Sequence, residues 1–338
     1  MMIRALPATC PRNRKNDTGH LGRTASTVGT GYRAEEVEPC MGGMSEKDWE
    51  RLIYQLRTGH CTPFVGAGAS MSVLPSGRQL STMLAAKCDY PGPETSELPR
   101  VAQYASFDYG DLSHVKYLVR DELTKGDRTP DFGDHNEPHA VLADFPLPVY
   151  LTTNYDDFIV QALATRRKAA RAAICPWNEA IVPDPLFKDA EGWNPSPSTP
   201  LVYHLHGAMR DPATFVLAED DYMMFLRNLA IERKIGGNRM FPPSILAALT
   251  TRPLLFIGYS LQDWTTRAMF AELGRSIPAL SRRRHVSVQL APGDASGWTV
   301  EDLERQLSWY YREWQITVYW GGIEDFCTEL RDRMGAMS

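Results

Sequence analysis

Apolar side chains begin to recur at helical spacing just after residue 44. Trp49, Leu52, Ile53 and Leu56 occupy positions i, i+3, i+4 and i+7, which lie on one face of an α-helix. This spacing predicts an amphipathic helix over Ser45 to Gly59.

Short apolar runs of strand type alternate with helical patterns over the rest of the chain. The predicted strands are Cys61 to Val65, Val149 to Thr153, Leu201 to Leu205, Leu254 to Ile257, His285 to Leu290 and Gln315 to Tyr319. The predicted helices are Arg78 to Lys87, Leu98 to Phe107, Asp111 to Leu123, Pro138 to Asp144, a segment ending at Ala164, Asp263 to Leu273, Val300 to Arg312 and Glu324 to Met334. This alternation is typical of a parallel sheet covered on both faces, so we predict a doubly wound, mostly parallel, Rossmann-like α/β fold.

The pattern divides the sequence at residue 44. Residues 1–43 show no periodicity and are rich in basic residues, which predicts a disordered segment or an over-extended N-terminus with Met44 as a natural start. A targeting segment of the transit-peptide type is the alternative. Residues 44–338 are expected to form one domain, with a helical insertion around 98–144 and an irregular, proline-rich loop over 176–200. Whether this loop closes over a ligand stays open at this stage.

Charge and composition narrow the classes of function. The 338 residues carry 36 Lys and Arg against 41 Asp and Glu, a formal charge of -5, so the basic footprint of a whole-chain nucleic-acid binder is absent. No run of about 18 uncharged apolar residues occurs, which excludes a membrane-spanning helix. The six cysteines are far apart with no C-x-x-C pair, so a tetrathiolate zinc site has no support and a reducing, cytoplasmic location is expected.

Small residues follow the first predicted strand in the segment Gly66-Ala-Gly68. Such a loop before a helix exposes backbone N–H groups to a diphosphate, but the G-x-G-x-x-G pattern is incomplete because Met71 stands at its last position. No Walker lysine follows, which argues against phosphoryl transfer of the P-loop kind. The loop is interpreted either as a dinucleotide cradle or as a simple tight turn.

Amide and carboxylate side chains follow the strand that ends near residue 153. Asn154 can hydrogen-bond a ribose hydroxyl or orient a water molecule, and it can equally cap the following helix. Asp156 and Asp157 would stabilise the N-terminus of that helix whatever the function.

Two histidines end the strand near residue 205. His204 and His206 lie at i and i+2, hence on one face of an extended strand, which could suggest a metal site, although no third ligand accompanies them. His206 before Gly207 is better suited to a general base, because a histidine pKa near ~6.5 allows proton uptake at neutral pH. Ligands of such sheets bind outside the carboxyl ends of the strands, so the glycine loop, Asn154, His206 and Ser260 are expected to meet in one crevice.

Together these motifs resemble the sirtuin family, and more closely its zinc-less, sirtuin-like branch of NAD-consuming proteins in bacterial antiphage defence. The resemblance covers about Cys61 to Asp263. The segments that carry it are similar to the glycine-rich NAD loop, the T-x-N-x-D element, the histidine–glycine pair and the late glycine–serine element of the family. In this order they are Phe64-Val-Gly-Ala-Gly-Ala-Ser70, Thr152-Thr-Asn-Tyr-Asp156, His204-Leu-His-Gly207 and Gly258-Tyr-Ser260.

The resemblance also implies roles for individual residues. Asn154 and Asp156 would hold the nicotinamide ribose and its water, and His206 would be the base. The residues implied to bind the NAD molecule are Gly66, Ala67, Gly68, Ser70, Thr153, Gly258, Tyr259 and Ser260.

The activity implied by the resemblance is that of an NAD glycohydrolase, which releases nicotinamide and ADP-ribose and depletes NAD as the effector of a defence system. The chain lacks the two C-x-x-C pairs of the sirtuin zinc module and the G-I-P-x-F-R continuation of the glycine loop. No zinc is therefore expected, and NAD-dependent protein deacylation is kept only as an alternative. The other alternative is a sensor subunit that binds NAD or an ADP-ribose derivative without turnover.

An unregulated NAD hydrolase would poison its own cell, so the resemblance implies control by assembly. Only one predicted helix follows Tyr319, so we expect a homo-oligomer that associates with a separately encoded ATPase. A HerA-type hexameric DNA translocase is the leading expectation from the family. Nucleic acid is then expected to be contacted only through that partner, and a membrane not at all.

Overall fold

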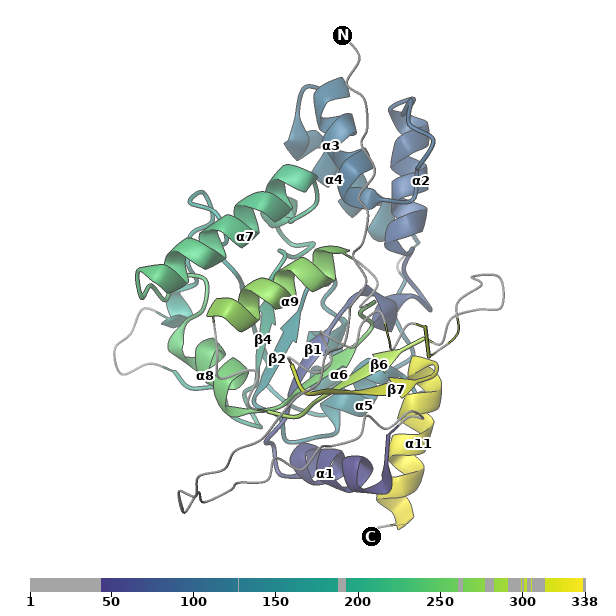
Figure 1. Ribbon diagram of the computed structural model, residues 1–338, viewed down its shortest axis with the longest axis vertical. Helices are drawn as coiled ribbons and strands as arrows, with labels where there is room; N and C mark the ends of the chain where they lie inside the picture. Colours follow the sequence, from purple (N-terminus) through teal and green to yellow (C-terminus); the bar gives the residue numbers. More distant parts are fainter. Residues whose placement is uncertain are drawn as a thin grey trace, which may run out of the picture. The chain divides into compact units, whose positions relative to one another are not determined.

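The structure of the protein is a computed structural model (Figure 1). It describes residues 44–126, 128–187, 193–260, 264–276, 283–290, 299, 301–302, 305 and 314–336. The expectations for residues 1–43, and most of the predicted helix Val300 to Arg312, lie outside these residues.

A parallel sheet forms the centre of the domain, and seven strands of it lie in the described part of the chain. Their order across the sheet is β3-β4-β2-β1-β5-β6-β7. The bounds are β1 (Thr62–Val65), β2 (Val149–Thr152), β3 (Arg171–Ile174), β4 (Leu201–His204), β5 (Leu254–Ile257), β6 (His285–Gln289) and β7 (Ile316–Trp320). Every neighbouring pair is parallel, so the predicted doubly wound, Rossmann-like fold is confirmed.

Helices cover both faces of this sheet (Figure 1). The α-helices are α1 (Glu46–Arg57), α2 (Gly77–Lys87), α3 (Leu98–Asp108), α4 (Leu112–Leu123), α5 (Pro138–Ala143), α6 (Phe158–Thr165), α7 (Glu219–Lys234), α8 (Pro243–Thr251), α9 (Trp264–Ser276) and α11 (Ile323–Ala336). Three short 3-10 turns are η1 (Ala67–Ser70), η2 (Pro185–Phe187) and η3 (Pro212–Thr214). The sequence patterns did not predict β3, α7 or α8.

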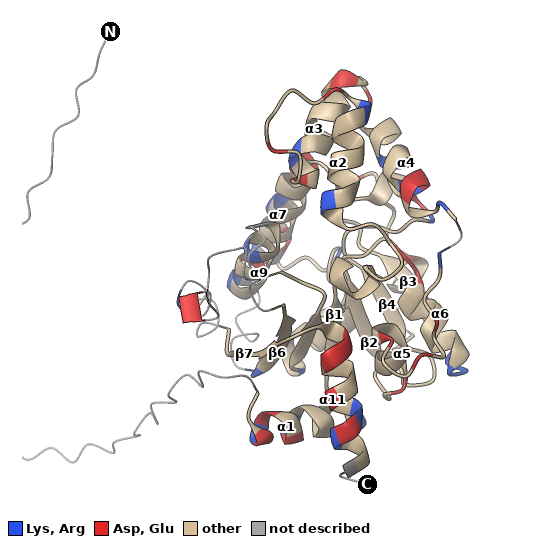
Figure 2. Ribbon diagram, turned by 90° about the vertical axis from the view of Figure 1, so that its right-hand side faces the viewer, with Lys and Arg blue, Asp and Glu red and all other residues tan. Residues whose placement is uncertain are grey.

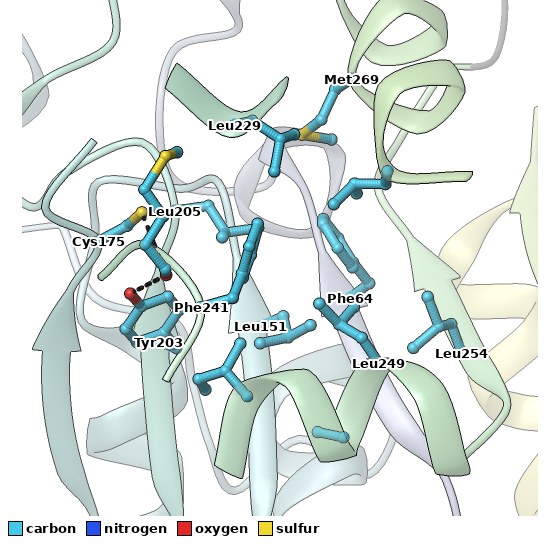
Figure 3. Close-up of a cluster of buried hydrophobic side chains, with 14 of the residues drawn as sticks. Phe64, Leu151, Cys175, Tyr203, Leu205, Leu229, Phe241, Leu249, Leu254 and Met269 are labelled. Carbon is cyan, nitrogen blue, oxygen red and sulfur yellow. Dashed lines mark hydrogen bonds between the residues drawn. The ribbon is translucent and has the colours of Figure 1, made fainter. Parts of the chain in front are cut away.

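Alternation along the strands sends successive side chains to two separate cores. Phe64 of β1 packs in one core with residues of α7, α8 and α9, and the next residue, Val65, packs in the other with residues of α1, α5, α6 and α11. Figure 3 shows the first core, where Phe64, Leu151 and Leu249 lie close together between the sheet and α8. Each fully buried Phe or Leu side chain contributes about 1.5–3 kcal/mol to folding.

A third core lies beside the sheet, and α3 and α4 of the expected helical insertion contribute to it, whereas α5 packs in the second core. Helices α2, α3 and α4 pack on each other through side chains such as Leu84, Val101 and Val119, all without exposed surface. Charged side chains fall mostly on the helices and loops rather than on the strands (Figure 2). Two of these charged side chains form a buried ion pair: Lys116 Nζ of α4 lies 3.0 Å from Asp221 Oδ2 of α7, which ties α4 to α7.

The order of the strands places a crevice at the carboxyl end of β1. The chain passes from β1 to β2 and β4 on one side, and then returns to β5 on the other side of β1. The connection after β1 therefore leads to one side of the sheet and the connection after β5 to the other, and this kind of switch point is where open α/β sheets bind ligands. No helix among the described residues has the length and apolar character needed to cross a membrane.

Candidate functional site

A pocket of about 410 Å³ opens at the carboxyl ends of the strands. Its walls come from the turns after β1, β2, β4 and β5, from the start of α2 and α3, and from α7 and α9. The sequence-predicted site residues that line it are Ala67, Ser70, Thr153, Asn154, Asp156, His206, Gly258, Tyr259 and Ser260. The structure thus brings together residues that the sequence analysis assigned to one crevice.

Gly66 and Gly68 do not line the pocket, and the structure gives another reason for their lack of a side chain. A Cβ atom on Gly66 would lie 2.7 Å from the carbonyl oxygen of Gly258, and one on Gly68 would lie 2.8 Å from its Cα. Gly258 itself has φ of +79° and touches the backbone of the β1 loop in return. The glycines allow the loops after β1 and β5 to pack backbone to backbone. The prediction that they cradle a diphosphate stays untested.

The side chain of Asn154 is held by the loop after β1. Its Nδ2 group donates to the carbonyl oxygen of Gly66 (3.1 Å) and to Ser70 Oγ (3.2 Å), and Ser70 Oγ donates to Asp156 Oδ2 (3.0 Å). Both amide hydrogens are thereby used, so Oδ1 is the end of the amide left to accept a hydrogen bond. Asn154 Oδ1 is buried without a hydrogen-bond partner among the described residues.

The interpretation of Asn154 as a helix cap is wrong. The N-cap of α6 is Asp157, and Asp156 Oδ1 accepts a hydrogen bond from the backbone N–H of Phe158 at the start of that helix. Asn154 lies three residues before the cap, too early to reach the orphan N–H groups of the first turn, and its side chain turns toward the β1 loop instead.

Thr153 and Tyr259 join the turns after β2 and β5. Tyr259 Oη donates to the carbonyl oxygen of Val65 (3.2 Å), so Thr153 Oγ1 is the donor to Tyr259 Oη over 2.8 Å. The two residues line the pocket while these bonds fix their hydroxyl groups. They act as part of the wall that separates the pocket from the core around Phe64, whose ring meets Tyr259 edge to face.

His206 lies two residues after the end of β4 and lines the pocket, with aromatic side chains of α7 against its ring. Its ring meets Tyr222 and Phe225 of α7 edge to face, with centroids 5.4 and 5.1 Å apart, and only 7% of the residue is exposed. Burial lowers the pKa of His206 to about 3, so the imidazole is neutral at pH 7. Its Nε2 atom is buried without a hydrogen-bond partner among the described residues. A neutral, unpartnered imidazole is the form needed to accept a proton.

Gly207 fixes the turn that carries His206. Its φ is +90°, and a Cβ atom there would lie 2.3 Å from the carbonyl oxygen of Thr214. That carbonyl accepts a hydrogen bond from Trp177 Nε1 (2.8 Å), and the N–H of Val216 donates to the carbonyl oxygen of His206 (2.9 Å). The histidine–glycine pair is therefore set by close backbone packing as well as by any chemistry.

His204 does not line the pocket. It is the last residue of β4 and is fully buried, with Nδ1 3.1 Å from the carbonyl oxygen of Asn154. Burial lowers its pKa, and the nearby Asp157 carboxylate opposes that shift. Among the described residues, no group of three or more His, Cys, Asp and Glu side chains is arranged to hold a metal ion.

Several lining residues were missed by the sequence analysis because they come from helices whose roles the motifs did not reveal. Tyr222 belongs to the unpredicted α7, and Thr266 and Met269 belong to α9. Arg78 lies in the first turn of α2, and Glu97 is the N-cap of α3. Arg78 is the one Lys or Arg among the described lining residues, and the carboxylates among them are Glu97 and Asp156. The sequence held one signal for Arg78, which is the first basic residue after the glycine loop.

The irregular stretch over 176–200 contributes no described residue to the pocket lining. Its start is anchored instead, because Arg239 Nη2 donates to the carbonyl oxygens of Asn178 and Ile181, each over 2.8 Å. Trp177 is buried in the first core, and Trp193 packs against it.

Comparisons with known proteins agree with this geometry. A family model described as a SIR2-like domain matches residues 148–319, which include the turns that carry Asn154, His206 and Gly258. The chain belongs to the SIR2-like family.

Curated relatives of this SIR2-like chain include proteins named NAD(+) hydrolase ThsA. The one from Bacillus cereus (strain MSX-D12) is 26% identical over 225 residues, which cover 66% of this chain and 41% of that protein. The one from Cytobacillus dafuensis is 28% identical over 215 residues, which cover 63% of this chain and 38% of that protein. The matched part of the SIR2-like chain thus spans about two fifths of the length of these relatives.

Proposed function

We propose that this SIR2-like chain hydrolyses NAD to nicotinamide and ADP-ribose. The observation that carries the proposal is a pair of buried acceptors in the pocket lining, Asn154 Oδ1 and His206 Nε2, to which no described residue makes a hydrogen bond. Buried polar atoms are nearly always hydrogen-bonded, so two such acceptors in one pocket indicate where hydroxyl groups or a reacting water bind. The names of the curated relatives support NAD as the molecule concerned.

The reaction breaks the bond between C1′ of the ribose and N1 of the nicotinamide ring. The electron pair of that bond goes to the ring nitrogen, and nicotinamide leaves as a neutral molecule. A water oxygen adds to C1′, and its proton passes to the neutral imidazole of His206 and then to solvent. Asn154 would orient the water or a ribose hydroxyl through Oδ1, and the buried Asp156 carboxylate would stabilise the positive charge that develops on the ribose.

The charges of the pocket suit this substrate. NAD carries a negatively charged diphosphate, and Arg78 brings a guanidinium to the wall formed by the start of α2. A guanidinium can make paired hydrogen bonds with phosphate oxygens, so we assign the diphosphate to this end of the pocket. The nicotinamide ribose would then lie at the other end, against Asn154 and His206.

The test is nicotinamide release from NAD by the purified protein, alone and with any protein that co-purifies with it. We expect His206→Ala and Asn154→Ala each to lower the rate by about 100-fold or more. His60→Ala is the matched control, because His60 is exposed, lies outside the pocket lining, and its ring hydrogen-bonds the nearby Thr58. Loss of release in both pocket variants and not in the control would establish the activity and its site.

The alternative outcome would support a sensor. If the wild-type protein binds NAD but releases no nicotinamide in any of these preparations, the proposal of hydrolysis fails and the pocket serves for ligand recognition. Thermal unfolding with and without NAD would detect that binding, since a ligand that binds only the native state raises the melting temperature.

We also propose a biological setting for this activity. NAD depletion would make the protein a cytoplasmic effector of antiphage defence, and control would come from assembly as a homo-oligomer with a HerA-type ATPase. The support is the sirtuin-like motif set and the harm that unregulated NAD hydrolysis would do to the cell. Size-exclusion chromatography with light scattering, on the protein alone and co-expressed with its genomic neighbour, tests this setting; a monomer in every preparation would contradict it.

A further inference from the structure

His204 is a buried histidine that the proposed reaction does not use. It ends β4 beside Thr152 of β2, and none of its surface is exposed. Its Nδ1 atom lies 3.1 Å from the main-chain carbonyl oxygen of Asn154. A carbonyl oxygen only accepts hydrogen bonds, so Nδ1 carries the hydrogen and His204 is the donor.

This contact completes the restraints on Asn154. The N–H of Asn154 donates to Thr152 Oγ1 (2.9 Å), and its side chain donates to Gly66 and Ser70. The carbonyl oxygen is the remaining polar group of the main chain, and among the described residues the hydrogen bond that holds it comes from His204. Rotation of the peptide plane after Asn154 would also move Asp156, whose carboxylate accepts from Ser70.

The other side of the His204 ring faces a second pair of charged groups. Nε2 lies 3.6 Å from Asp157 Oδ1, and Arg210 Nη1 lies 3.7 Å from the same oxygen. Both distances exceed that of a good hydrogen bond, and Nε2 of His204 and Oδ1 of Asp157 are buried with no hydrogen-bond partner in the part of the chain that the structure describes. Among the described residues, the imidazole thus makes its hydrogen bond through Nδ1, and Asp157 acts on it through charge alone.

We propose that His204 is a positioning residue, which acts through Nδ1–H on the main-chain carbonyl of Asn154 and thereby sets the place of the Asn154 amide in the pocket. This inference rests on the proposed function for its kinetic consequence. A misplacement of about 1 Å at a reacting group can lower a rate by about 100-fold, so the contact should act mainly on kcat.

Three substitutions separate this role from simple filling of the core. In His204→Asn the side-chain amide nitrogen can occupy the place of Nδ1 and donate to the same carbonyl. In His204→Gln the amide reaches toward the place of Nε2, and in His204→Leu no donor remains. We expect kcat for NAD to fall about 10- to 100-fold in the Gln and Leu variants, with KM changed about twofold at most, and to stay within about threefold of wild type in the Asn variant.

A second readout does not depend on activity. In protein labelled with ¹⁵N-asparagine, the side-chain NH₂ signal of Asn154 is identified by its loss in Asn154→Ala. We expect this signal to keep its shift and its slow hydrogen exchange in His204→Asn, and to lose both in His204→Gln and His204→Leu. Circular dichroism confirms that each variant is folded; if the Leu variant does not fold, the contrast between Asn and Gln decides.

The outcomes distinguish this inference from the proposed function. Wild-type activity with equal kcat and equal NH₂ signals in all variants overturns the positioning role and leaves NAD hydrolysis standing. Equal loss in the Asn and Gln variants also overturns it, because Nδ1–H would then not be the group that matters. Absence of nicotinamide release from the wild type defeats the proposed function, and the NH₂ signals still decide the role of His204.

Discussion

Ser70 and Asn154 are 84 residues apart in the chain, and Asn154 Nδ2 donates to Ser70 Oγ over 3.2 Å. The same hydroxyl donates to Asp156 Oδ2, so it accepts from one pocket residue and donates to another. These hydrogen bonds use the NH₂ group of Asn154 as a donor. The amide oxygen is left as an acceptor to which no described residue donates.

Ser70→Ala should therefore lower activity without preventing folding. The variant leaves one amide hydrogen of Asn154 and one carboxylate oxygen of Asp156 without a partner, a loss of about 1–3 kcal/mol in a buried site. We expect kcat for nicotinamide release to fall about 10-fold or more. Ser72→Ala, at an exposed position of the same loop, is the control and should match the wild type.

The low pKa of His206 predicts an unusual pH dependence. The folded protein holds this imidazole neutral down to a pH of about 3, whereas the unfolded chain protonates it below about 6.5. Between these values the unfolded state binds more protons, so the contribution of His206 to stability is complete above about pH 6.5 and declines as the pH falls toward 3. His206→Gln should remove this part of the pH dependence of the urea midpoint.

The same pKa governs activity. Because the base stays unprotonated, kcat/KM for NAD should show no loss near pH 6.5 that is due to His206, and should stay level down to about pH 5. A fall with a midpoint near 6.5 that disappears in His206→Gln but not in His60→Gln would contradict the buried, neutral state.

Arg78→Gln should weaken binding of the diphosphate more than it slows the chemistry. Removal of a charge-assisted hydrogen bond costs about 1.5–3 kcal/mol, so we expect KM for NAD to rise about 10-fold or more with kcat changed far less. Nicotinamide riboside lacks the diphosphate and provides the internal control. If its hydrolysis is impaired to the same extent as that of NAD, the diphosphate does not contact Arg78.

Alanine substitutions at Gly207 and Gly110 separate the cost of a left-handed backbone from the cost of a steric clash. Both have positive φ, +90° and +67°, but a Cβ atom on Gly110 would meet nothing within 4 Å, whereas one on Gly207 would meet the Thr214 carbonyl at 2.3 Å. Gly110→Ala should lose only about 1–2 kcal/mol from the left-handed backbone. Gly207→Ala should lose about 3 kcal/mol or more, and activity with it. If urea unfolding gives the same loss in the free energy of unfolding for both variants, the clash in Gly207→Ala is relieved without cost.

The buried ion pair between the insertion and α7 should matter for stability. In Lys116→Met the Asp221 carboxylate stays buried, and the N–H groups of Leu217 and Ala218 are the donors left to it among the described residues, which should cost about 3–5 kcal/mol. Arg120→Ala removes one partner of the more exposed pair with Asp121 and should cost about 1 kcal/mol or less. A similar shift of the urea midpoint in the two variants would contradict this prediction.

The sheet could be predicted because its strands are short apolar runs, while α7 could not be. Met223 and Ile235 of the α7 region are exposed, and the charged Asp221 and Glu232 are buried. These positions blur the apolar face that Phe225 and Leu229 form on the same helix. The two carboxylates can be buried because each accepts backbone N–H bonds from residues outside the helix. β3 was missed because it is an edge strand in which only Ala173 is fully buried.

The site was predictable where it depends on strand ends and not where it depends on packing between loops. Asn154 and His206 follow β2 and β4 directly, so motif and topology indicate the same place. Tyr222 enters the pocket from α7, and no local pattern relates it to His206. The glycines at 66 and 68 suggested a ligand, but their closest neighbour is Gly258, nearly two hundred residues later.

The contact between Gly66 and Gly258 has a consequence during protein synthesis, because Gly258 is synthesised long after Gly66. A nascent chain has Asn154 and His206 outside the ribosome long before β5 emerges, but until then the β1 loop lacks the neighbour against which it packs. Prematurely terminated products that stop before Leu254 would also lack the wall formed by Gly258, Tyr259 and Ser260. The proposed NAD hydrolase would in this way acquire its pocket only after β5 has been synthesised.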